Sequence, residues 1–467
     1  MKLRDYQEEL VSSVKQSILN GNRSIIVQSP PRSGKTVVMA HIAKGATDKG
    51  NKVLFFSHRK EINDQVKETF NRNGVNTDLL TIGTVGSLVR KLENLPPPEI
   101  ILVDEAHHIK AKQYQKILNY FDKAYHLFFT GTPIRLDGSG FKDMADDLVV
   151  GKSIKWLQDQ GNISKYRYYS LELIDKEKLK KSHGDYTIKS IDESLDSWKM
   201  VNGDYVTHYE DLAKGKQAIV YASSVVKATE IATVFSERGY SSAVIHGSTP
   251  KGIRDKAMKD FRDGDLLIMV NVNLFTEGID LPSVDVCIML RPTTSLSLYL
   301  QFAMRALNPR DGKEAILIDH VGNWKIHGFP NQDRNWTLEG KKKKSKDKDD
   351  SPAARECPKC YGAFFSTDIV NGCCPYCGEK LKEEPKKVEM KKVNGELVRV
   401  DEIIEIELNG KNVEMSPKDY AVFSKVKKYG KNWRQCQTLP ELQAFALIHN
   451  YKKGWIYYKQ KEKEIWR

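Results

Sequence analysis

The residues with the most recognisable chemistry begin at Ser29, where the sequence reads Ser-Pro-Pro-Arg-Ser-Gly-Lys-Thr up to Thr36. This stretch follows an apolar run and precedes a helix-like one, and in such a unit backbone N–H groups wrap phosphates at the helix N-terminus. We expect Lys35 to reach the β- and γ-phosphates of ATP and Thr36 to ligate Mg²⁺. Ser33 and Gly34 would line the same loop. The usual first glycine is replaced by Ser29, so the strand–loop–helix context carries much of this prediction.

A second set of candidate catalytic groups is the run Asp-Glu-Ala-His at residues 104–107, where an apolar stretch ends. A carboxylate at the carboxyl end of a strand, beside a phosphate loop, is where a further Mg²⁺ contact belongs, and Asp104 fits this role. Glu105 could then orient or deprotonate the attacking water. The alternative is a pair of exposed carboxylates that open a helix and are stabilised by its dipole. The phosphate loop upstream in the same block favours the catalytic interpretation.

Five of the seven cysteines lie within residues 357–377. Cys357 and Cys360 form one C-x2-C pair, and Cys374 and Cys377 form another, a pattern typical of a four-thiolate Zn²⁺ ribbon. Cys373 is one residue out of this pairing, so we interpret it as a spare. The N-terminus carries charges where an export signal would be apolar, which favours metal-bound thiolates over disulfides. Such a closed site is structural, and gripping nucleic acid is one use for the module.

Apolar runs alternate with helix-like stretches and must position these residues. Near-continuous apolar runs of this length are typical of strands buried on both faces of a parallel sheet. They fall into two α/β blocks separated by a mixed, charged interlude. The expected strands are 24–28, 53–57, 100–104 and 126–130 in the first block, and 218–222, 242–246, 266–270, 284–290 and 315–319 in the second.

The composition excludes a membrane protein and points to a polyanionic partner. No apolar run of the 467 residues approaches the ~18 that a membrane span needs, so we expect a cytoplasmic protein without a membrane partner. The net charge is +13, and residues 341–467 hold 28 basic against 19 acidic side chains. Nucleic acid is the natural partner of such a surface, and solubility is the alternative. Trp455, Tyr457 and Tyr458 lie among lysines and could stack bases or pack a small core.

These patterns predict a division of the chain into six segments. The run Lys-Lys-Lys-Lys-Ser-Lys-Asp-Lys-Asp-Asp at 341–350 is most simply a flexible linker. The segments are a first, ATP-binding lobe at 1–150, a connector at 151–215, a second lobe at 216–335, a charged linker at 336–355, a zinc ribbon at 356–380 and a basic α+β domain at 381–467.

Taken in order, the motifs across residues 1–325 resemble those of a superfamily 2 helicase of the DEAH type. The resemblance implies two tandem RecA-like lobes with ATP in the cleft between them. Arg4-Asp-Tyr-Gln7 resembles the R-x-Y-Q element that reads adenine in this family. The other matching motifs are Ia from Ser57 to Gln65, Ib at 84–88, III at 130–133, IV at 218–224, V at 271–280 and VI at 301–308.

The resemblance also assigns roles to single residues. It implies that Gln301 and Arg305 act in hydrolysis, with Arg305 as the candidate arginine finger. The residues implied on the nucleic-acid side are Arg59, Thr84, Ser223 and Thr276, and those on the nucleotide side are Arg4, Gln7, Gly278 and Asp280.

Three positions depart from the family pattern. Motif VI of the family reads Q-x-x-G-R-x-x-R, whereas here Met304 replaces the glycine and Asn308 replaces the second arginine, the usual finger. Arg310, two residues later, could compensate. In the phosphate loop Arg32 replaces a usual glycine and adds positive charge near the phosphates. Because an arginine finger contributes on the order of 10³-fold or more to turnover, hydrolysis could be slow or dependent on a partner.

The order of two lobes, the segment Asp-His-Val-Gly-Asn at 319–323, a four-cysteine ribbon and a short C-terminal domain resembles bacteriophage replication helicases. This implies a DNA helicase acting on single-stranded or forked DNA, with replication proteins as partners, in the cytoplasm of a bacterial host. One alternative is a nucleotide-gated DNA-binding or loading factor with weak hydrolysis. Another is an RNA helicase, because the family motifs grip the sugar-phosphate backbone and read no base.

Overall fold

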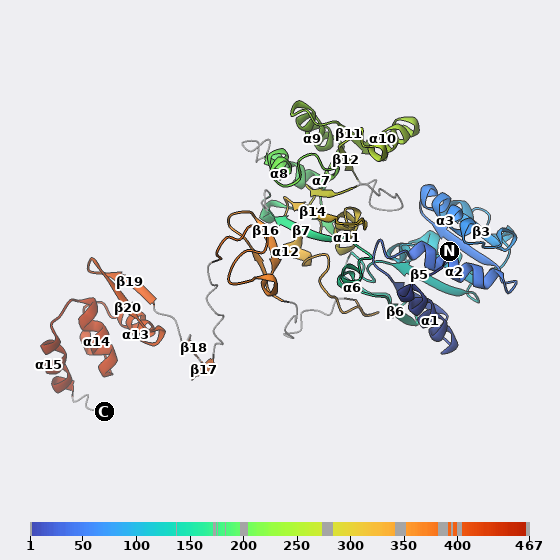
Figure 1. Cartoon of the computed structure of the whole chain (residues 1–467). Helices are drawn as coiled ribbons and strands as arrows, with labels where there is room; N and C mark the ends of the chain where they lie inside the picture. Colours follow the sequence, from blue (N-terminus) through green and yellow to red (C-terminus); the bar gives the residue numbers. More distant parts are fainter. Residues whose placement is uncertain are drawn as a thin grey trace. The chain divides into compact units, whose positions relative to one another are not determined.

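The computed structural model forms two compact units, Met1–Leu381 and Lys382–Arg467 (Figure 1). Among the described residues no helix is long and apolar enough to cross a membrane. The charged run at 341–350 lies outside the described residues. These are 2–136, 138–170, 174, 176–182, 184–196, 204–272, 284–340, 352–381, 391–393, 396–398 and 404–463.

The first lobe, blue in Figure 1, is built on a parallel six-stranded sheet in the order β3-β2-β4-β5-β1-β6. The four expected strands are present, and the edge strands β3 and β6 are additional. The strands are β1 (Ser24–Gln28), β2 (Val53–Ser57), β3 (Leu80–Thr84), β4 (Ile100–Val103), β5 (Tyr125–Thr130) and β6 (Asp147–Val150).

Both faces of this sheet are covered by helices. Successive strand residues point to opposite faces, so Ile25 and Val27 pack into one apolar cluster while Ile26 packs into another. This burial on both sides explains why the central strands are apolar at nearly every position. The first face is covered by α1 (Asp5–Leu19), α2 (Lys35–Thr47) and α3 (Lys60–Arg72), and the second by α4 (Val85–Val89) and α5 (Lys112–Tyr120).

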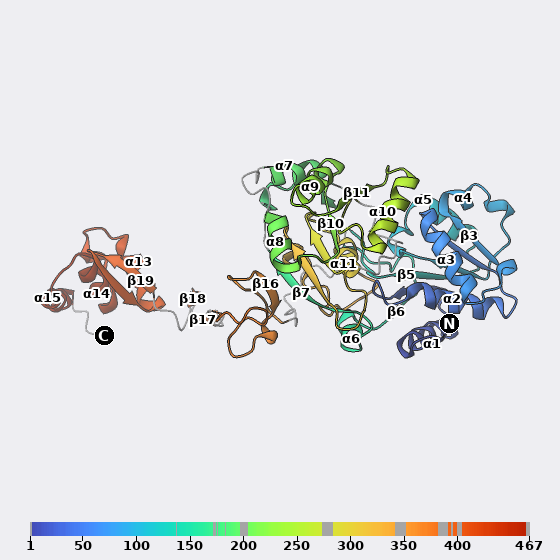
Figure 2. The same cartoon turned by 45° about the horizontal axis from the view of Figure 1, so that its top comes forward.

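The second lobe has an eight-stranded sheet in the order β11-β12-β10-β13-β14-β7-β16-β15 (Figure 2). Its first six strands are parallel, which confirms the prediction of tandem RecA-like lobes. They are β7 (Lys165–Ser170), β10 (Ala218–Tyr221), β11 (Ser242–His246), β12 (Ile268–Val272), β13 (Val286–Met289) and β14 (Glu314–Asp319).

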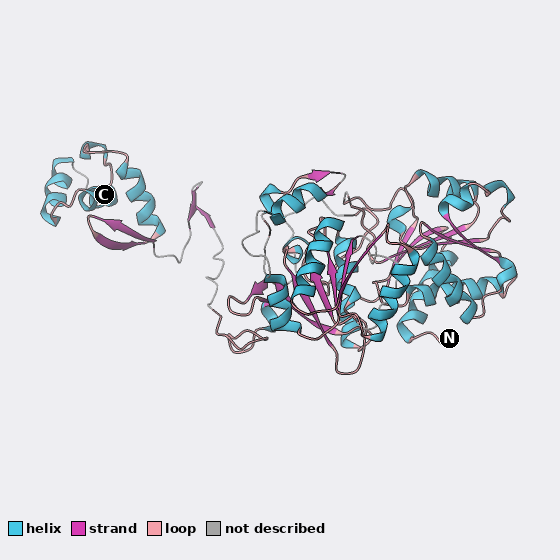
Figure 3. Ribbon diagram, turned by 90° about the horizontal axis from the view of Figure 1, so that it is seen from above, coloured by secondary structure: helices cyan, strands magenta, loops and turns pink. Residues whose placement is uncertain are grey.

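Helices again lie on both sides of the second sheet, as Figure 3 shows. The strand β7 comes from the segment expected as a connector; its sequence, Lys-Tyr-Arg-Tyr-Tyr-Ser, alternates charge and aromatics and lacks an apolar run. The helices are α6 (Ile154–Asp159), α7 (Ile188–Asp196), α8 (Asp204–Ala213), α9 (Val225–Glu237), α10 (Lys251–Asp263), α11 (Leu296–Arg305) and α12 (Asn323–His327).

The cysteine-rich segment extends the second sheet instead of standing apart from it. Its strand β16 (Gly362–Phe365) pairs antiparallel with β7, and β15 (Ala354–Glu356) pairs with β16. The two strands β16 and β7 lie side by side in Figures 1 and 2. The ring of Tyr376 fixes the joint further, because its hydroxyl accepts a hydrogen bond from the backbone N–H of Tyr168 at 3.2 Å.

After the second lobe the chain returns to the first. Residues 336–340, the return segment, place the carbonyl of Leu338 2.7 Å from the backbone N–H of Phe141, and Gly340 bridges to Ser139. Gly140 allows this close approach, because a Cβ there would lie 1.9 Å from the Leu338 carbonyl oxygen. The two lobes are therefore joined by the chain at a second place, beyond the crossing near α6.

The second unit is small and mainly helical. A hairpin turns at Asn409 and Gly410, both with positive φ, as the Asn-Gly pair predicts. Trp455 packs against the unit's core, whereas Tyr457 and Tyr458 are exposed. The elements are β17 (Lys391–Val393), β18 (Glu396–Val398), β19 (Ile404–Leu408), β20 (Lys411–Met415), α13 (Pro417–Lys427), α14 (Leu439–Ile448) and α15 (Lys453–Lys463).

Replacing Gly140 by alanine should loosen the return segment. The new Cβ would collide with the Leu338 carbonyl, a backbone atom that cannot move aside alone, and we expect a loss of about 2 kcal/mol. Thermal unfolding of the two-lobe unit would measure it. Gly45→Ala is the matched control, since that helical position has open space around it and alanine favours helix. Equal melting temperatures for the two variants would contradict the prediction.

Candidate active site and metal centre

The phosphate loop lies at the carboxyl end of β1 and leads into α2. Gly34 caps the helix with a φ of 83°, and Arg32 is also left-handed, with a φ of 69°. For a residue with a side chain this conformation costs on the order of 1 kcal/mol. The loop is braced from inside: the Ser29 and Ser33 hydroxyl oxygens lie 2.5 Å apart, and the Ser33 hydroxyl donates to the carbonyl of Pro30 at 2.5 Å.

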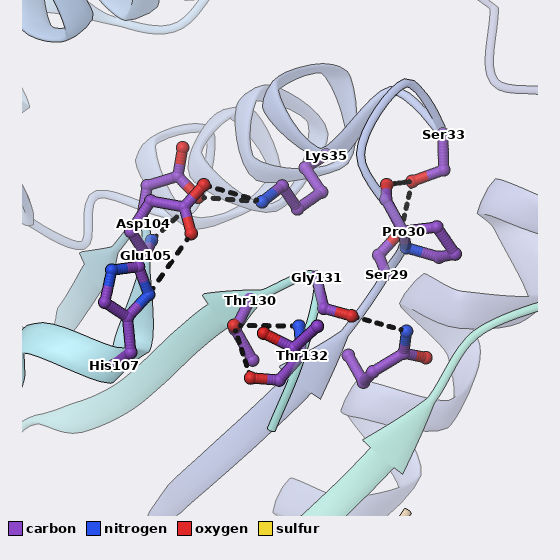
Figure 4. A network of polar contacts seen from close by, with 11 residues as sticks. Ser29, Pro30, Ser33, Lys35, Asp104, Glu105, His107, Thr130, Gly131 and Thr132 are labelled. Carbon is purple, nitrogen blue, oxygen red and sulfur yellow. Dashed lines mark hydrogen bonds and ion pairs between the residues drawn. The ribbon is translucent and has the colours of Figure 1, made fainter. Parts of the chain in front are cut away.

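Lys35 projects from the start of α2 towards the end of β4, where it meets both expected carboxylates (Figure 4). Its Nζ is 3.4 Å from Oδ1 of Asp104 and 3.4 Å from Oε1 of Glu105. All three side chains are at most 14% exposed. Burial opposes the lysine charge, but the two carboxylates outweigh it and raise the pKa of Lys35 above its ordinary value. Lys35 is therefore charged at any physiological pH.

The Glu105 backbone is held in an unusual conformation. Its φ is 55°, in the left-handed region, and it begins the short turn that carries His107. The other carboxylate oxygen of Glu105 lies 3.4 Å from Nδ1 of His107. Strained residues at the end of a strand are common where a catalytic group must be aimed, so the geometry directs Glu105 into the space above Lys35.

The donor set beside Lys35 suits Mg²⁺. The Thr36 hydroxyl belongs to the first turn of α2, and the Asp104 carboxylate already lies against the neighbouring Lys35. Hydroxyl and carboxylate oxygens are the hard ligands that Mg²⁺ prefers. Both residue types therefore fit the ion.

The expected adenine-reading element braces the phosphate loop in this structure. Nε2 of Gln7 donates to the carbonyl of Ser33 at 3.1 Å, and Oε1 of Gln7 accepts from the backbone N–H of Arg4 at 3.0 Å. The Tyr6 hydroxyl donates to the same Ser33 carbonyl at 3.0 Å. Tyr6 was part of the sequence pattern but carried no predicted role; its place between Arg4 and Gln7 in that element is the sequence signal that could have identified it.

Motif III lies directly beneath the loop. The hydroxyl of Thr130 accepts from the backbone N–H of Thr132 at 3.1 Å, and Nε2 of Gln28 donates to the Gly131 carbonyl at 3.1 Å. The backbone N–H of Ser29 donates to the carbonyl of Thr130 at 2.9 Å. A shift of the phosphate loop would therefore change the hydrogen bond between Ser29 and Thr130.

The second lobe contributes α11, which carries motif VI. Gln301 is 8% exposed and borders a cavity of about 200 Å³ whose other walls come from both lobes. His107, Arg135 and Leu296 also line it. The carbonyl of Arg305, at the last turn of α11, accepts a hydrogen bond from Nη2 of Arg32 at 3.4 Å, so the phosphate loop and motif VI are in contact.

Asn308 and Arg310 are engaged within the second lobe. Nζ of Lys313 donates to Oδ1 of Asn308 at 2.7 Å, and Asn308 is only 5% exposed. Arg310 pairs with Asp285 before the start of β13. Met304, in place of the family glycine, is buried in the core of the lobe.

The predicted nucleic-acid residues have different surroundings. Arg59 precedes α3 and its Nε lies 3.1 Å from Nε2 of His58, while Thr84 caps α4 through Ser87. Ser223 is fully buried, and its hydroxyl donates to Asp192 at 2.5 Å, so in this conformation it lies inside the lobe and not on a strand-binding surface. The predictions for Thr276, Gly278 and Asp280 lie outside the described residues.

The four predicted metal ligands converge. The Sγ atoms of Cys357, Cys360, Cys374 and Cys377 all lie within 4.8 Å of one another. The backbone N–H of Tyr376 donates to Sγ of Cys374 at 3.4 Å, as expected in a knuckle. Cys373 is not part of this group; its thiol donates to the carbonyl of Asn371 at 3.5 Å. Four thiol groups at such distances fit the tetrahedral ligand set of Zn²⁺.

Comparison with known proteins places this site in a family. The description "Type III restriction enzyme, res subunit" matches residues 1–135, and "Helicase conserved C-terminal domain" matches residues 203–309. A "51.5 kDa protein" of Lactococcus phage (isolate 7-9) is 41% identical over 363 residues, which are 77% of this chain and 79% of that protein. The "DNA 3'-5' translocase XPB2" of Sulfurisphaera tokodaii is 26% identical over 69% of this chain and 82% of its own length.

The "Putative ATP-dependent helicase IRC3" of Saccharomyces cerevisiae is 24% identical over 68% of this chain, which spans about half of that protein, 51%. Among solved structures, a fragment assigned to the HsdR subunit of a type I restriction enzyme from Vibrio vulnificus YJ016 has a TM-score of 0.54 at 19% identity. That likeness covers 70% of this chain and 67% of the fragment, and it bears on the fold alone.

Replacing Lys35 by alanine should abolish the phosphate-binding charge. We expect ATP turnover to fall by about 10²–10³-fold, the usual consequence of losing one preorganised donor to a reacting oxyanion. Steady-state phosphate release would measure it. Lys44→Ala, on the same helix with an exposed pair to Asp48, is the control and should keep normal turnover. Retained turnover in Lys35→Ala would dismiss the phosphate-loop assignment.

Proposed function

Because the chain belongs to the superfamily 2 helicases, we propose that it is a motor that hydrolyses ATP to move along and separate strands of DNA. The observation that carries the proposal is the contact of Lys35 with Asp104 and Glu105 at the end of β4, beside a phosphate loop whose Arg32 contacts motif VI on α11. A nucleotide bound there would touch both lobes, so its hydrolysis could change how the lobes meet.

The residues divide the chemistry between them. Lys35 and the loop N–H groups hold the phosphates, and Glu105 takes the proton of the attacking water. Mg²⁺, held by Thr36 and Asp104, would neutralise phosphate charge. Once the phosphates draw Lys35 away, Asp104 loses a partner 3.4 Å from one oxygen and becomes available as a ligand.

DNA is the proposed track because of the charge distribution and the relatives. Residues 341–467 carry most of the excess positive charge, which favours a polyanion. One relative is named a DNA translocase. Arg59 and Thr84 are proposed contacts on the first lobe, and Thr276 on the second. Single-stranded or forked DNA is the proposed form, and a replication role, with replication proteins as partners in a bacterial cytoplasm, rests on the likeness to a phage protein.

We further propose that the four cysteines bind Zn²⁺. The ion would hold the two knuckles together and thereby stabilise β16, which pairs with β7 of the second lobe. The ribbon would then serve as a rigid extension of this lobe, from which it could grip DNA.

A second candidate function is a nucleotide-gated DNA-binding or loading factor with weak hydrolysis. The observation that favours it is that the usual finger position holds Asn308, whose side chain accepts a hydrogen bond from Lys313 inside the second lobe. The two functions differ in whether nucleic acid accelerates ATP turnover.

Steady-state ATPase rates, with and without single-stranded DNA or RNA of equal length, separate these functions. We expect strong stimulation by DNA and weaker stimulation by RNA, since a motor couples hydrolysis to its track. Equal or greater stimulation by RNA would instead indicate an RNA helicase. A flat, near-zero rate with intact binding of ATP and DNA would support the gated binder.

Cys360→Ser should release the metal, because the hydroxyl is a poor substitute for a thiolate ligand. We expect zinc content, measured by mass spectrometry of the purified chain, to fall from about one ion per chain towards zero. Cys373→Ser is the matched control and should keep its zinc. Loss of zinc from Cys373→Ser, with retention in Cys360→Ser, would refute the ligand set.

A further inference from the structure

The arginine of the phosphate loop has no role in the function described so far. Arg32 stands where the family pattern has a glycine, and it keeps the left-handed backbone, φ 69°, that glycine would adopt without cost. A side chain held in such a conformation commonly indicates a functional demand at that position. The position of its guanidinium indicates what this demand is.

Arg32 projects away from its own lobe and contacts motif VI. Its Nη2 lies 3.4 Å from the carbonyl oxygen of Arg305, at the C-terminal end of α11. The end of a helix carries partial negative charge and attracts a cation. The Arg32 guanidinium therefore reaches the boundary between the phosphate loop and the carboxyl end of α11.

The charge of Arg32 also affects the pKa of buried groups in the second lobe. Burial lowers the pKa of Lys313 to about 8 against the pull of Asp285, and the positive charges of Arg310 and Arg32 add to the lowering. Arg32 and Arg305 likewise both act on the buried phenol of Tyr221. The Arg32 charge therefore acts on Lys313, the lysine that donates to Asn308.

Two of the positions named by the sequence pattern do not supply the charge of an arginine finger, and of the named arginines Arg305 remains on α11. Position 308 is an asparagine whose side chain accepts from Lys313 at 2.7 Å, and Arg310 is paired with Asp285. The second lobe thus lacks the family's second arginine at its usual place, while the first lobe carries an extra arginine, Arg32, in contact with the end of α11.

We propose that Arg32 replaces the missing arginine finger, from the phosphate loop itself, by leaving the Arg305 carbonyl and binding the γ-phosphate as hydrolysis proceeds. The proposal rests on the proposed ATPase function. The water oxygen bonds to the γ-phosphorus, the bond from that phosphorus to the β–γ bridging oxygen breaks, the water proton passes to Glu105, and the electron pair leaves on ADP. Arg32 takes part in no bond change and offsets the negative charge that develops on the departing oxygens.

The test compares Arg32→Gly and Arg32→Lys with the unsubstituted full chain at saturating ATP and DNA. Glycine suits a positive φ, so Arg32→Gly should fold with an unchanged or higher melting temperature. We expect its turnover to fall on the order of 10³-fold, with little change in the affinity for a non-hydrolysable ATP analogue. The turnover of Arg32→Lys should lie between those of Arg32→Gly and the unsubstituted chain, because lysine keeps the positive charge but lacks the two-pronged donor geometry of a guanidinium. Arg72→Ala, an exposed arginine paired with Glu68, is the control and should keep normal turnover.

A second measurement determines the affinity for an analogue of the transition state. The affinity of Arg32→Gly for ADP with aluminium fluoride should fall by a factor similar to the loss in turnover, whereas its affinity for ADP alone should not change. Turnover and aluminium-fluoride affinity within about threefold of the unsubstituted chain would overturn the proposal. So would faster hydrolysis, which would make Arg32 an inter-lobe latch. If the unsubstituted chain itself does not hydrolyse ATP, the proposed function fails, and the affinity ratio for the two ADP complexes still decides the role of Arg32.

Discussion

The buried charge of Lys35 is the constraint around which the first lobe is arranged. An ammonium group removed from water is costly unless it is paired, and here two carboxylates from the end of β4 provide the pairing. The lysine thereby occupies, before nucleotide binds, the position of a counter-ion to Asp104. In the proposed binding of phosphate and Mg²⁺, each of these charges would exchange one partner for another and none would remain buried alone. The site is thus ready for a polyanion without being unstable in its absence.

The sequence was sufficient to predict which functional groups at the ends of buried strands lie close together. The carboxyl ends of parallel strands meet at one edge of a sheet, so Asp104 and Lys35 had to come together once β1 and β4 were recognised. The edge strands β3 and β6 were missed because only one of their sides is covered and their residues are mixed. The strand β7 was missed for a similar reason: it joins a parallel sheet to an antiparallel ribbon, so its burial is uneven.

Contacts between distant segments could not be predicted from local pattern. Nothing in a single motif indicates that Gln7 would hold the Ser33 carbonyl, or that Ser223 would be buried against Asp192. These side chains can serve the protein's own backbone or a ligand, and only the packing around them decides which. The metal ligands are the opposite case, because Cys357 and Cys360 belong to a local knuckle whose spacing determines its geometry.

The return segment limits how the two lobes can move. A body attached to another by a single flexible chain can swing and twist freely, but attachment at two separate places leaves mainly rotation about the line that joins them. Within the described residues the chain passes to the second lobe near α6, and the return segment attaches to the first lobe through Leu338, whose carbonyl accepts from the backbone N–H of Phe141. The two lobes therefore have fewer independent relative motions than two bodies joined by a single linker.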